Sequence, residues 1–231
     1  MADIKLEELL AQRDKAEFGS EEWERLNIEK ADYLESIKPS TRERIVFFEE
    51  KDLGNISGVF TKETQIFDLP FGVGRRSLLE YHPTRRHPIP YVLIRYEDEY
   101  FFILRESGGG ELRLIGKKGL IGGHVDDTDI TEGDLERTFQ NALLREAKEE
   151  AGLDEGIIEC VELRGIIKSD LGVDIDHLGL VYEIVVNTDN IKSEEDGVMT
   201  GVWIAKEDLP EHYESFENWS KIVYDNLLKN C

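Results

Sequence analysis

The sequence predicts an α/β protein with helices packed on a layered sheet, and three observations support this fold class. Short apolar segments typical of strands recur between residues 89 and 204. A long helical pattern, from about residue 131 to 151, interrupts them, and an amphipathic pattern at residues 216–227 follows the last of them. Strands that flank one long helix and are closed by another favour helices on the faces of a single sheet.

The chain is expected to begin with an N-terminal extension, residues 1–87. Residues 3–37 are rich in Glu, Lys, Leu and Ala and contain no proline. This pattern predicts two short helices, with Ser20 as the N-cap of the second. A strand is predicted at residues 44–48. Residues 53–88 hold much of the glycine and proline of the chain and are expected to be irregular or short-stranded.

The main predicted domain covers residues 88–231. Two apolar segments around the turn Glu97-Asp98-Glu99 predict a hairpin. The predicted strands of the domain lie at residues 89–95, 100–105, 112–115, 160–167, 178–186 and 202–204. The long helix is expected to end at Gly152, because glycine readily adopts the left-handed conformation that terminates helices.

The composition excludes several kinds of partner. The net charge of −22 argues against a protein that coats nucleic-acid polymers or binds membrane surfaces, since both need a basic surface. The arginine pairs at 75–76 and 85–86 could still supply a local basic patch for a polyanionic substrate. No segment approaches the roughly 18 apolar residues that span a bilayer, and no signal segment is seen. The two cysteines, Cys160 and Cys231, suit a reducing compartment, so a cytoplasmic location is predicted.

The end of the long helix carries three glutamates. On a helical wheel with about 100° per residue, Glu146, Glu149 and Glu150 fall on the arc of the apolar side chains between residues 135 and 143. Lys148 points the opposite way. The apolar face is therefore expected to stop before the helix ends, with three neighbouring carboxylates in its place.

Such a carboxylate cluster is costly without a counter-charge. Like charges at this spacing repel one another, burial adds a desolvation cost, and the negative end of the helix dipole adds further repulsion. A bound cation would relieve the cost, and clustered oxygen ligands suit Mg²⁺ or Mn²⁺ better than zinc. The alternative is an exposed acidic helix end in a protein that is acidic everywhere, and the spacing alone does not decide between the two.

The same segment resembles the second half of the Nudix box, Arg-Glu-apolar-x-Glu-Glu-x-Gly-apolar. The residues that match are Arg145, Glu146, Ala147, Glu149, Glu150, Gly152 and Leu153. The resemblance implies an α/β/α sandwich with a mixed sheet, in which the three glutamates hold divalent cations that bridge a diphosphate. It also implies that Arg145 orients a glutamate by a salt bridge. Gly122 and Gly123 would be the glycines that let the backbone approach the substrate phosphates.

The first half of the box departs from the family pattern. The family places a glycine fourteen residues and a glutamate eight residues before the box arginine, where this chain has Thr131 and Arg137. Gly123 lies 22 residues before Arg145, so the loop is about eight residues longer, and the inserted segment 125–132 is acidic. This chain has Ile-Pro-Tyr-Val before the hairpin, at 89–92, and Gly-Gly-His after it, at 122–124. In both segments it resembles a bacterial Nudix subgroup with a similarly lengthened loop.

Other side chains are candidates for binding the substrate or moving a proton. His124 could be a metal ligand, a phosphate contact or a general base, or simply a loop histidine bonded to the backbone. Lys118 could meet a substrate phosphate, or belong to a solvated surface pair with Lys117. Nudix enzymes often draw a base from the loop before the strand of Trp203, which makes Glu195 a candidate beside the box glutamates.

The predicted function is Mg²⁺- or Mn²⁺-dependent hydrolysis of a small nucleoside diphosphate linked to another moiety. Residues 1–88 would shape the cleft or build a homodimer interface. Two alternatives stay open. An isoprenoid diphosphate isomerase shares the fold and uses a histidine ligand, for which His124 leaves room, but it needs a thiol that no cysteine near the loop supplies. A nucleotide-sensing module without activity is the other, and the intact glutamates argue against it.

Overall fold

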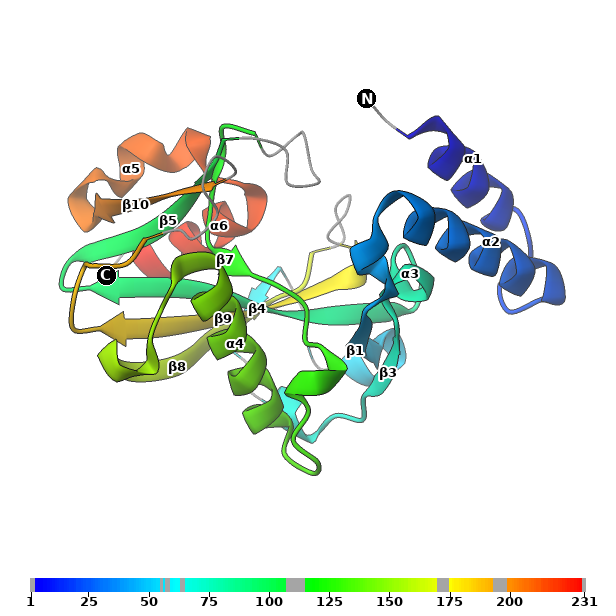
Figure 1. Cartoon of the computed structure of the whole chain (residues 1–231), viewed down its shortest axis with the longest axis horizontal. Coiled ribbons are helices and arrows are strands. Elements are labelled where there is room, and N and C mark those ends of the chain that lie inside the picture. Colours follow the sequence, from blue (N-terminus) through cyan, green and yellow to red (C-terminus); the bar gives the residue numbers. More distant parts are fainter. Residues whose placement is uncertain are drawn as a thin grey trace.

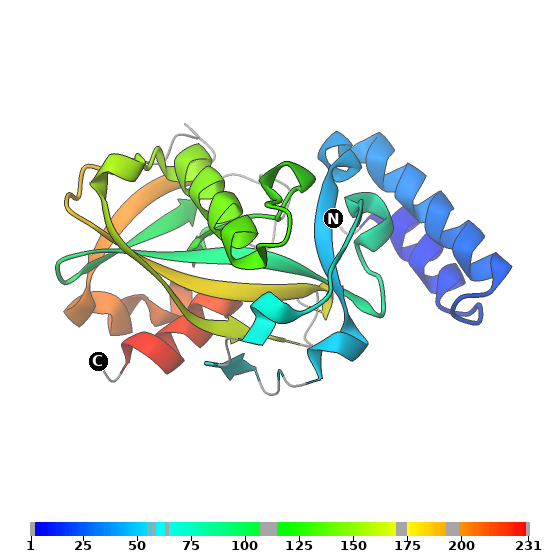
Figure 2. The same ribbon diagram turned by 90° about the horizontal axis from the view of Figure 1, so that it is seen from below.

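One mixed sheet with helices on both faces forms the body of the molecule (Figure 1). The computed structural model describes residues 3–54, 56, 59–62, 65–106, 115–169, 175–192 and 199–229. Helix α4 (Leu135–Ala151) covers one face, and α5 (Leu209–His212) and α6 (Asn218–Val223) cover the other (Figure 2). The predicted α/β/α sandwich with a mixed sheet is therefore confirmed.

The strands of the sheet follow an order that differs from their order in the chain. Across the sheet lie β10 (Met199–Ala205), β5 (Glu99–Arg105), β4 (Arg85–Tyr96), β9 (His177–Val186), β8 (Ile158–Ile167) and β2 (Phe60–Thr61). β4 and β9 are parallel, and the other neighbours in this order are antiparallel. Two short strands extend the sheet: β6 (Lys118–Gly119) pairs with β5, and β7 (Ile121–Gly122) pairs with β4. The glycine loop therefore starts beside the central strand.

Alternation along the central strand divides the core in two. Val92 and Ile94 of β4 pack in the core beneath α4, whereas Tyr91 and Leu93 pack in the core beneath the C-terminal helices. None of the four is more than 4% exposed. A strand that is buried on both faces reads as a continuous apolar run, and it needs helices on both sides of the sheet.

Helix α4 begins at Leu135, about four residues later than the sequence predicts. Its N-cap is Asp134, whose side chain accepts a hydrogen bond from the backbone N–H of Arg137 at 2.8 Å. Thr131 and Asp134 instead close a turn around Gly133, whose φ of 75° suits glycine. The predicted end at Gly152 is confirmed, with a left-handed φ of 58°.

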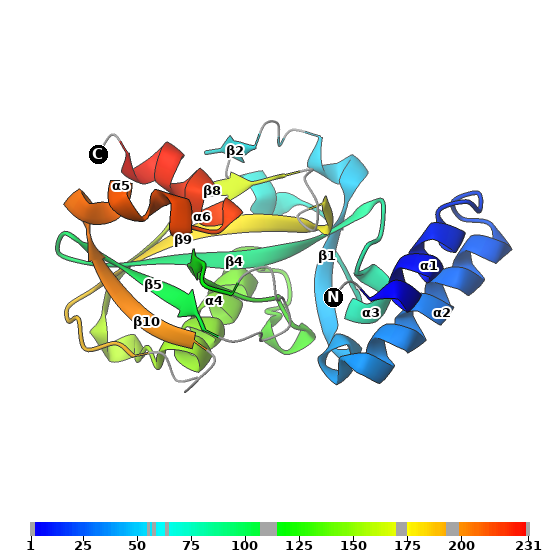
Figure 3. The same ribbon diagram turned by 90° about the horizontal axis from the view of Figure 1, so that it is seen from above.

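Helices α1 (Ile4–Arg13) and α2 (Glu21–Ile37) form a hairpin at one end of the sheet (Figure 3). The predicted N-cap is confirmed, because Oγ of Ser20 accepts a hydrogen bond from the backbone N–H of Trp23 at 3.2 Å. Lys30 is fully buried, and its Nζ donates to the backbone carbonyls of Ser77 and Glu80 at 2.7 Å each. These bonds satisfy carbonyls at and just beyond α3 (Arg76–Leu79) and attach the hairpin to the rest of the chain.

The second part of the predicted extension is built into the sheet. β1 (Arg44–Glu49) pairs with β3 (Gly72–Arg75) and with the start of β4, and β2 pairs with β8. The predicted strand at 44–48 is thereby confirmed. Short 3-10 turns connect the elements at Pro39–Arg42, Glu50–Leu53, Gln65–Asp68, Asp127–Asp129, Glu155–Ile157, Lys206–Asp208 and Tyr213–Ser215.

Two further expectations concern segments near the ends of the domain. Of the strand expected at 112–115, residues 112–114 lie outside the described residues, and Ile115 lies in a turn. The predicted C-terminal helix is present as α6, which continues into a π-helical turn, Tyr224–Leu228. Among the described residues, no helix has both the length and the apolar character that crossing a bilayer requires.

Candidate functional site

Arg145, near the end of α4, is the centre of a charged network. Its Nε and Nη2 donate to the two carboxylate oxygens of Asp129 at 3.0 and 2.8 Å, which makes a bidentate pair. Its Nη1 donates to Oε1 of Glu146 at 2.7 Å and to Oε2 of Glu149 at 3.3 Å. Nη2 also donates to the backbone carbonyl of His124 at 2.9 Å. One guanidinium thus ties the glycine loop to the helix and contacts two of the glutamates.

The Glu146 carboxylate lies directly on the backbone of Gly123. A Cβ atom added to Gly123 would stand 2.1 Å from Cδ and Oε1 of Glu146, so the carboxylate can occupy this position only beside a glycine. The Glu146 side chain is 13% exposed. Burial raises the pKa of this carboxyl, although Arg145 opposes the shift. A carboxylate that burial makes costly to ionise is stabilised by a further cation beside it.

The prediction that the glutamates replace the apolar face of α4 is wrong. Ala147 and Ala151 continue that face to the end of the helix, with exposed fractions of 0% and 1%. The buried stripe turns toward these alanines in the last two turns, so the glutamates border it instead. The Glu149 side chain is 60% exposed, whereas Oε2 of Glu150 is shielded from solvent. The three carboxylates therefore sit at different depths along one edge of the helix.

This edge of α4 could hold a divalent cation of the Mg²⁺ type. All of its donors are carboxylate oxygens, which suit the hard ions Mg²⁺ and Mn²⁺. Glu146 is already oriented by Arg145 and seated on glycine backbone, and Glu149 leaves the same edge open to solvent. The residues present thus fit the cation that the sequence predicts.

Asp129 belongs to this network, yet the sequence alone does not single it out. Its side chain is 6% exposed and lies in the lengthened loop. The loop carries a capping box, in which the backbone N–H of Asp126 donates to Oδ2 of Asp129 at 2.8 Å. Two aspartates three residues apart are typical of a capped turn, and this spacing was the available signal. The Asp126 carboxylate also lies 3.7 Å from Arg145, and burial raises its pKa.

The other predicted contacts for phosphate lie on the short strands. Gly122 is in β7 opposite Tyr91, where an added Cβ would meet the backbone carbonyl of Pro90 at 3.0 Å. Lys118 is in β6, and its Nζ donates to Oγ of Ser215 at 3.0 Å. The structure therefore gives Lys118 a partner in the C-terminal segment, and its contact with a phosphate stays a prediction.

The arginine pairs of the extension do not form a free basic patch. Each arginine has an acidic partner: Arg75 pairs with Glu35, Arg76 with Glu43 and Glu80, Arg85 with Glu49, and Arg86 with Glu50. Their charges are compensated within the extension and at its junction with β4. The candidate base Glu195 lies outside the described residues.

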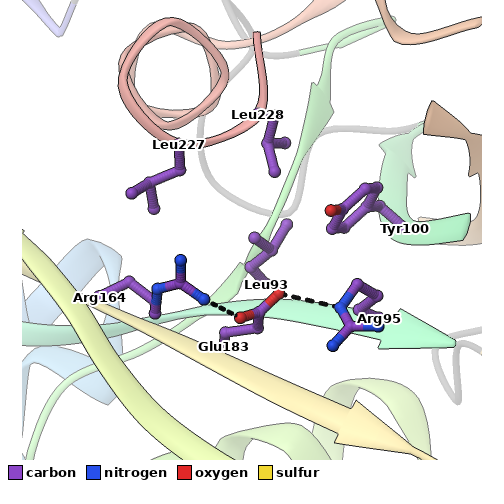
Figure 4. Close-up of a pocket in the computed structure, with 7 residues that line it drawn as sticks. All are labelled: Leu93, Arg95, Tyr100, Arg164, Glu183, Leu227 and Leu228. Carbon is purple, nitrogen blue, oxygen red and sulfur yellow. Dashed lines mark hydrogen bonds and ion pairs between the residues drawn. The ribbon is translucent and has the colours of Figure 1, made fainter. Parts of the chain in front are cut away.

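A separate hollow of about 190 Å³ lies on the face of the sheet away from α4 (Figure 4). Glu183 stands there between two arginines, and accepts hydrogen bonds from Nε of Arg95 at 3.1 Å and from Nη1 of Arg164. Leu93 and Leu227 supply part of its apolar wall. The hollow belongs to the core beneath the C-terminal helices, so it is not part of the α4 site.

Comparisons with known proteins agree with this fold and site. Among curated proteins, Protein YmaB of Bacillus subtilis (strain 168) is 28% identical over 189 residues, which cover 77% of this chain and 91% of YmaB. Among solved structures, Tm1382, a protein ascribed to the Nudix hydrolases, matches with a TM-score of 0.68 at 24% identity, covering 81% of this chain and 99% of Tm1382. DR0079 from Deinococcus radiodurans matches with a TM-score of 0.50 at 16% identity, covering 80% of this chain and 99% of its own.

These two structures show that the fold is shared. The family evidence is the NUDIX domain, whose model matches residues 85–227, more than half of the chain. The match begins with the first residue of β4 and contains the glycine loop, α4 and the C-terminal helices. The chain therefore belongs to the Nudix hydrolases, enzymes that hydrolyse diphosphate bonds.

Proposed function

We propose that this protein is a Mg²⁺-dependent pyrophosphohydrolase that cleaves a nucleoside diphosphate linked to another moiety. The observation that carries the proposal is the seating of the Glu146 carboxylate on Gly123, held there by Arg145. An oriented carboxylate, the candidate metal ligand, would then lie beside a stretch of backbone without side chains, residues 122–123. Phosphate oxygens and the cations that accompany them can approach such a stretch closely.

Each residue of the network then has a task in the reaction. When bound, the divalent cations neutralise the diphosphate, polarise phosphorus and lower the pKa of the attacking water. Glu146, Glu149 and Glu150 would hold them, and Arg145 would keep Glu146 in its orientation. A base must accept the proton of the water. Glu149, Glu150 and Glu195 are the candidates, and Glu149 has a solvent-exposed carboxylate.

Among the described residues, the isomerase alternative finds no thiol in the right place. Cys160 is exposed in β8 and pairs with Val185, near the end of β9. β9 begins at His177, eight residues before Val185. This end of β9 is the one near the glycine loop, because β4 pairs with both β9 and β7. Eight residues of strand span about 26 Å. The thiol is therefore remote from His124. A small-molecule nucleotide partner, a cytoplasmic location and a homodimer are further parts of the proposal that rest on the sequence.

The proposal is tested with Glu149→Gln, assayed against a panel of nucleoside diphosphate compounds with Mg²⁺ and with Mn²⁺. Release of mononucleotide or phosphate is expected to fall on the order of 100-fold, because the charge that holds a cation is lost while the size of the side chain is kept. Glu136→Gln is the matched control. It is an exposed glutamate in the first turn of the same helix, about 15 Å from Glu146. Unchanged turnover of Glu149→Gln would refute the assignment.

A further inference from the structure

Three histidines from distant parts of the chain gather at one end of the sheet. His87 in β4 and His177 in β9 are register partners in the parallel pair, and His124 follows β7, which pairs with β4. Their ring centroids are 5.2, 5.4 and 5.6 Å apart. One ligand nitrogen from each ring lies within 4.8 Å of the other two.

This histidine cluster faces away from the carboxylates of α4. Side chains alternate along a strand, so His87 and His177 share the face that packs beneath the C-terminal helices. The ring of His177 lies 6.5 Å from that of Trp219 in α6, which confirms this side. His124 joins the two regions, because its backbone carbonyl accepts from Arg145 while its ring belongs to the cluster. The cluster is therefore a separate set of potential ligands.

Three ring nitrogens of the cluster, on His87 and His124, are buried without a well-formed hydrogen bond. Both ring nitrogens of His87 and Nε2 of His124 are shielded from solvent, and among the described residues none of them makes a hydrogen bond of good geometry. Such burial is unfavourable for a neutral imidazole, which carries one N–H and one lone pair. Burial lowers the pKa of His87 to about 3, although Asp176 and the backbone carbonyl of Leu79 oppose the shift. Burial also lowers the pKa of His124 well below its ordinary value, so both rings keep the lone pairs that bind metals.

Asp176 orients the third ring. Its Oδ1 accepts the Nδ1–H of His177 at 2.8 Å, and its Oδ2 accepts the backbone N–H of Tyr81 at 2.6 Å. Because Nδ1 carries the proton, Nε2 is the basic nitrogen of this ring. A buried carboxylate on the remote N–H is the usual support of a histidine that ligates a metal. Tyr81 is held at a φ of 60°, a strained conformation for a residue with a side chain, and such strain often marks functional sites.

We propose that His87, His124 and His177 form a binding site for a divalent transition-metal ion of the Zn²⁺ type, distinct from the carboxylate site. Imidazole nitrogens select zinc and its neighbours, whereas Mg²⁺ prefers oxygen. In a tetrahedral zinc site with bonds of about 2.1 Å, the nitrogens lie about 3.4 Å apart. The most distant pair must therefore approach by roughly 1.4 Å, which small side-chain rotations supply. Three protein ligands leave a fourth position for water or an anion.

The test uses the purified full-length protein, stripped with a chelator and titrated with Zn²⁺ or with Co²⁺ as its spectroscopic substitute. We expect one equivalent of Zn²⁺ to remain after gel filtration, and Co²⁺ to give the intense visible absorption of a tetrahedral site. His87→Asn and His124→Asn should each weaken binding about 100-fold or more, and Asp176→Asn about 10- to 100-fold. His212→Asn, in α5 outside the cluster, is the matched control and should bind as the wild type does.

Two results would overturn the inference. One is a wild-type protein that retains no more Zn²⁺ than the His124→Asn variant does. Because His124 is only partly buried, this variant still provides the test should His87→Asn fail to fold. The other is Co²⁺ absorption that survives both histidine variants but is lost in Glu149→Gln, which would assign the ion to the carboxylates. Persistence of the absorption in Glu149→Gln is the expected result. This result is expected whether or not the protein hydrolyses diphosphates, so the proposed histidine site and the proposed activity can be refuted independently of each other.

Discussion

Replacing Gly123 with alanine separates the stability of the fold from the function of the site. The new Cβ would lie 2.1 Å from Cδ and Oε1 of Glu146, and 2.4 Å from Oε2. Carbon atoms in contact are at least about 3.5 Å apart, so the carboxylate must withdraw by about 1.4 Å. It is the far end of a flexible side chain, and Gly123 does not have a left-handed φ. The side chain of Glu146 therefore gives way rather than the backbone.

The expected loss of stability is small, and the expected loss of function is large. Withdrawal breaks the 2.7 Å bond from Arg145 to Glu146, and a hydrogen bond to a charged group contributes about 1.5–3 kcal/mol. Arg145 keeps Asp129 and the carbonyl of His124 as partners, and alanine returns about 0.4–1 kcal/mol by restricting the unfolded chain. The net loss of stability should be about 1–2 kcal/mol. Displacing Glu146, the proposed metal ligand, by more than 1 Å should lower turnover on the order of 100-fold.

Urea denaturation measures the first quantity, and Mn²⁺ titration by electron paramagnetic resonance with turnover measures the second. Gly156→Ala is the matched control, because its Cβ would meet only Oδ1 of Asp154, at an ordinary 3.4 Å. The reasoning is refuted if Gly123→Ala keeps the wild-type Mn²⁺ affinity and turnover. A loss of several kcal/mol would also contradict it, since the glycine would then be required by the fold itself.

Two other predictions follow from the charges around the site and in the extension. Asp129→Asn keeps the shape of the side chain but weakens the bidentate pair with Arg145, so Mn²⁺ affinity should fall about 10- to 100-fold; equal affinity would show that Arg145 does not depend on it. His82 is 5% exposed, its ring lies 5.3 Å from that of Trp23, and burial lowers its pKa from 6.5 to about 3. Only the unfolded chain binds this proton between those values, so stability should fall as the pH drops from 6.5, by at most about 2 kcal/mol at pH 5. His82→Gln should reduce the pH dependence of stability in urea titrations by its own share, because the buried His87 and His124 add to the same slope, and His212→Gln should leave the slope unchanged; a similar pH slope in both variants would contradict the assignment.

Much of the fold follows from local patterns in the sequence. The apolar run at 89–95 predicts a strand, and Ser20 and Gly152 mark helix ends, because these signals act within a few residues. The start of α4 was misplaced because the turn around Gly133 delays the helix to Leu135. The helical pattern in the sequence extends over this turn, so the pattern alone does not show that the helix begins after it.

The site was predictable where its parts are consecutive in the chain and not where they are distant. Glu146, Glu149 and Arg145 lie on one helix, and their contacts follow from their spacing. A helical wheel assumes a straight buried stripe, so it could not show that Ala147 continues the core while Glu149 faces solvent. The histidine cluster is further from prediction, because its rings meet only through the parallel pairing of β4 with β9.

The two departures from the Nudix pattern, a longer loop and an N-terminal extension, are coupled in the structure. Eight extra residues add little loop-closure entropy, but the loop must still hold Asp129 where Arg145 needs it. β1 supplies the support: the backbone N–H of Val46 donates to the carbonyl of Val125 at 2.8 Å, and Arg44 pairs with Asp127 at 3.3 Å. The extension thus bonds the loop, the loop bonds Arg145, and Arg145 orients Glu146. The strand at 44–49 is therefore part of the structure that positions the candidate metal ligands.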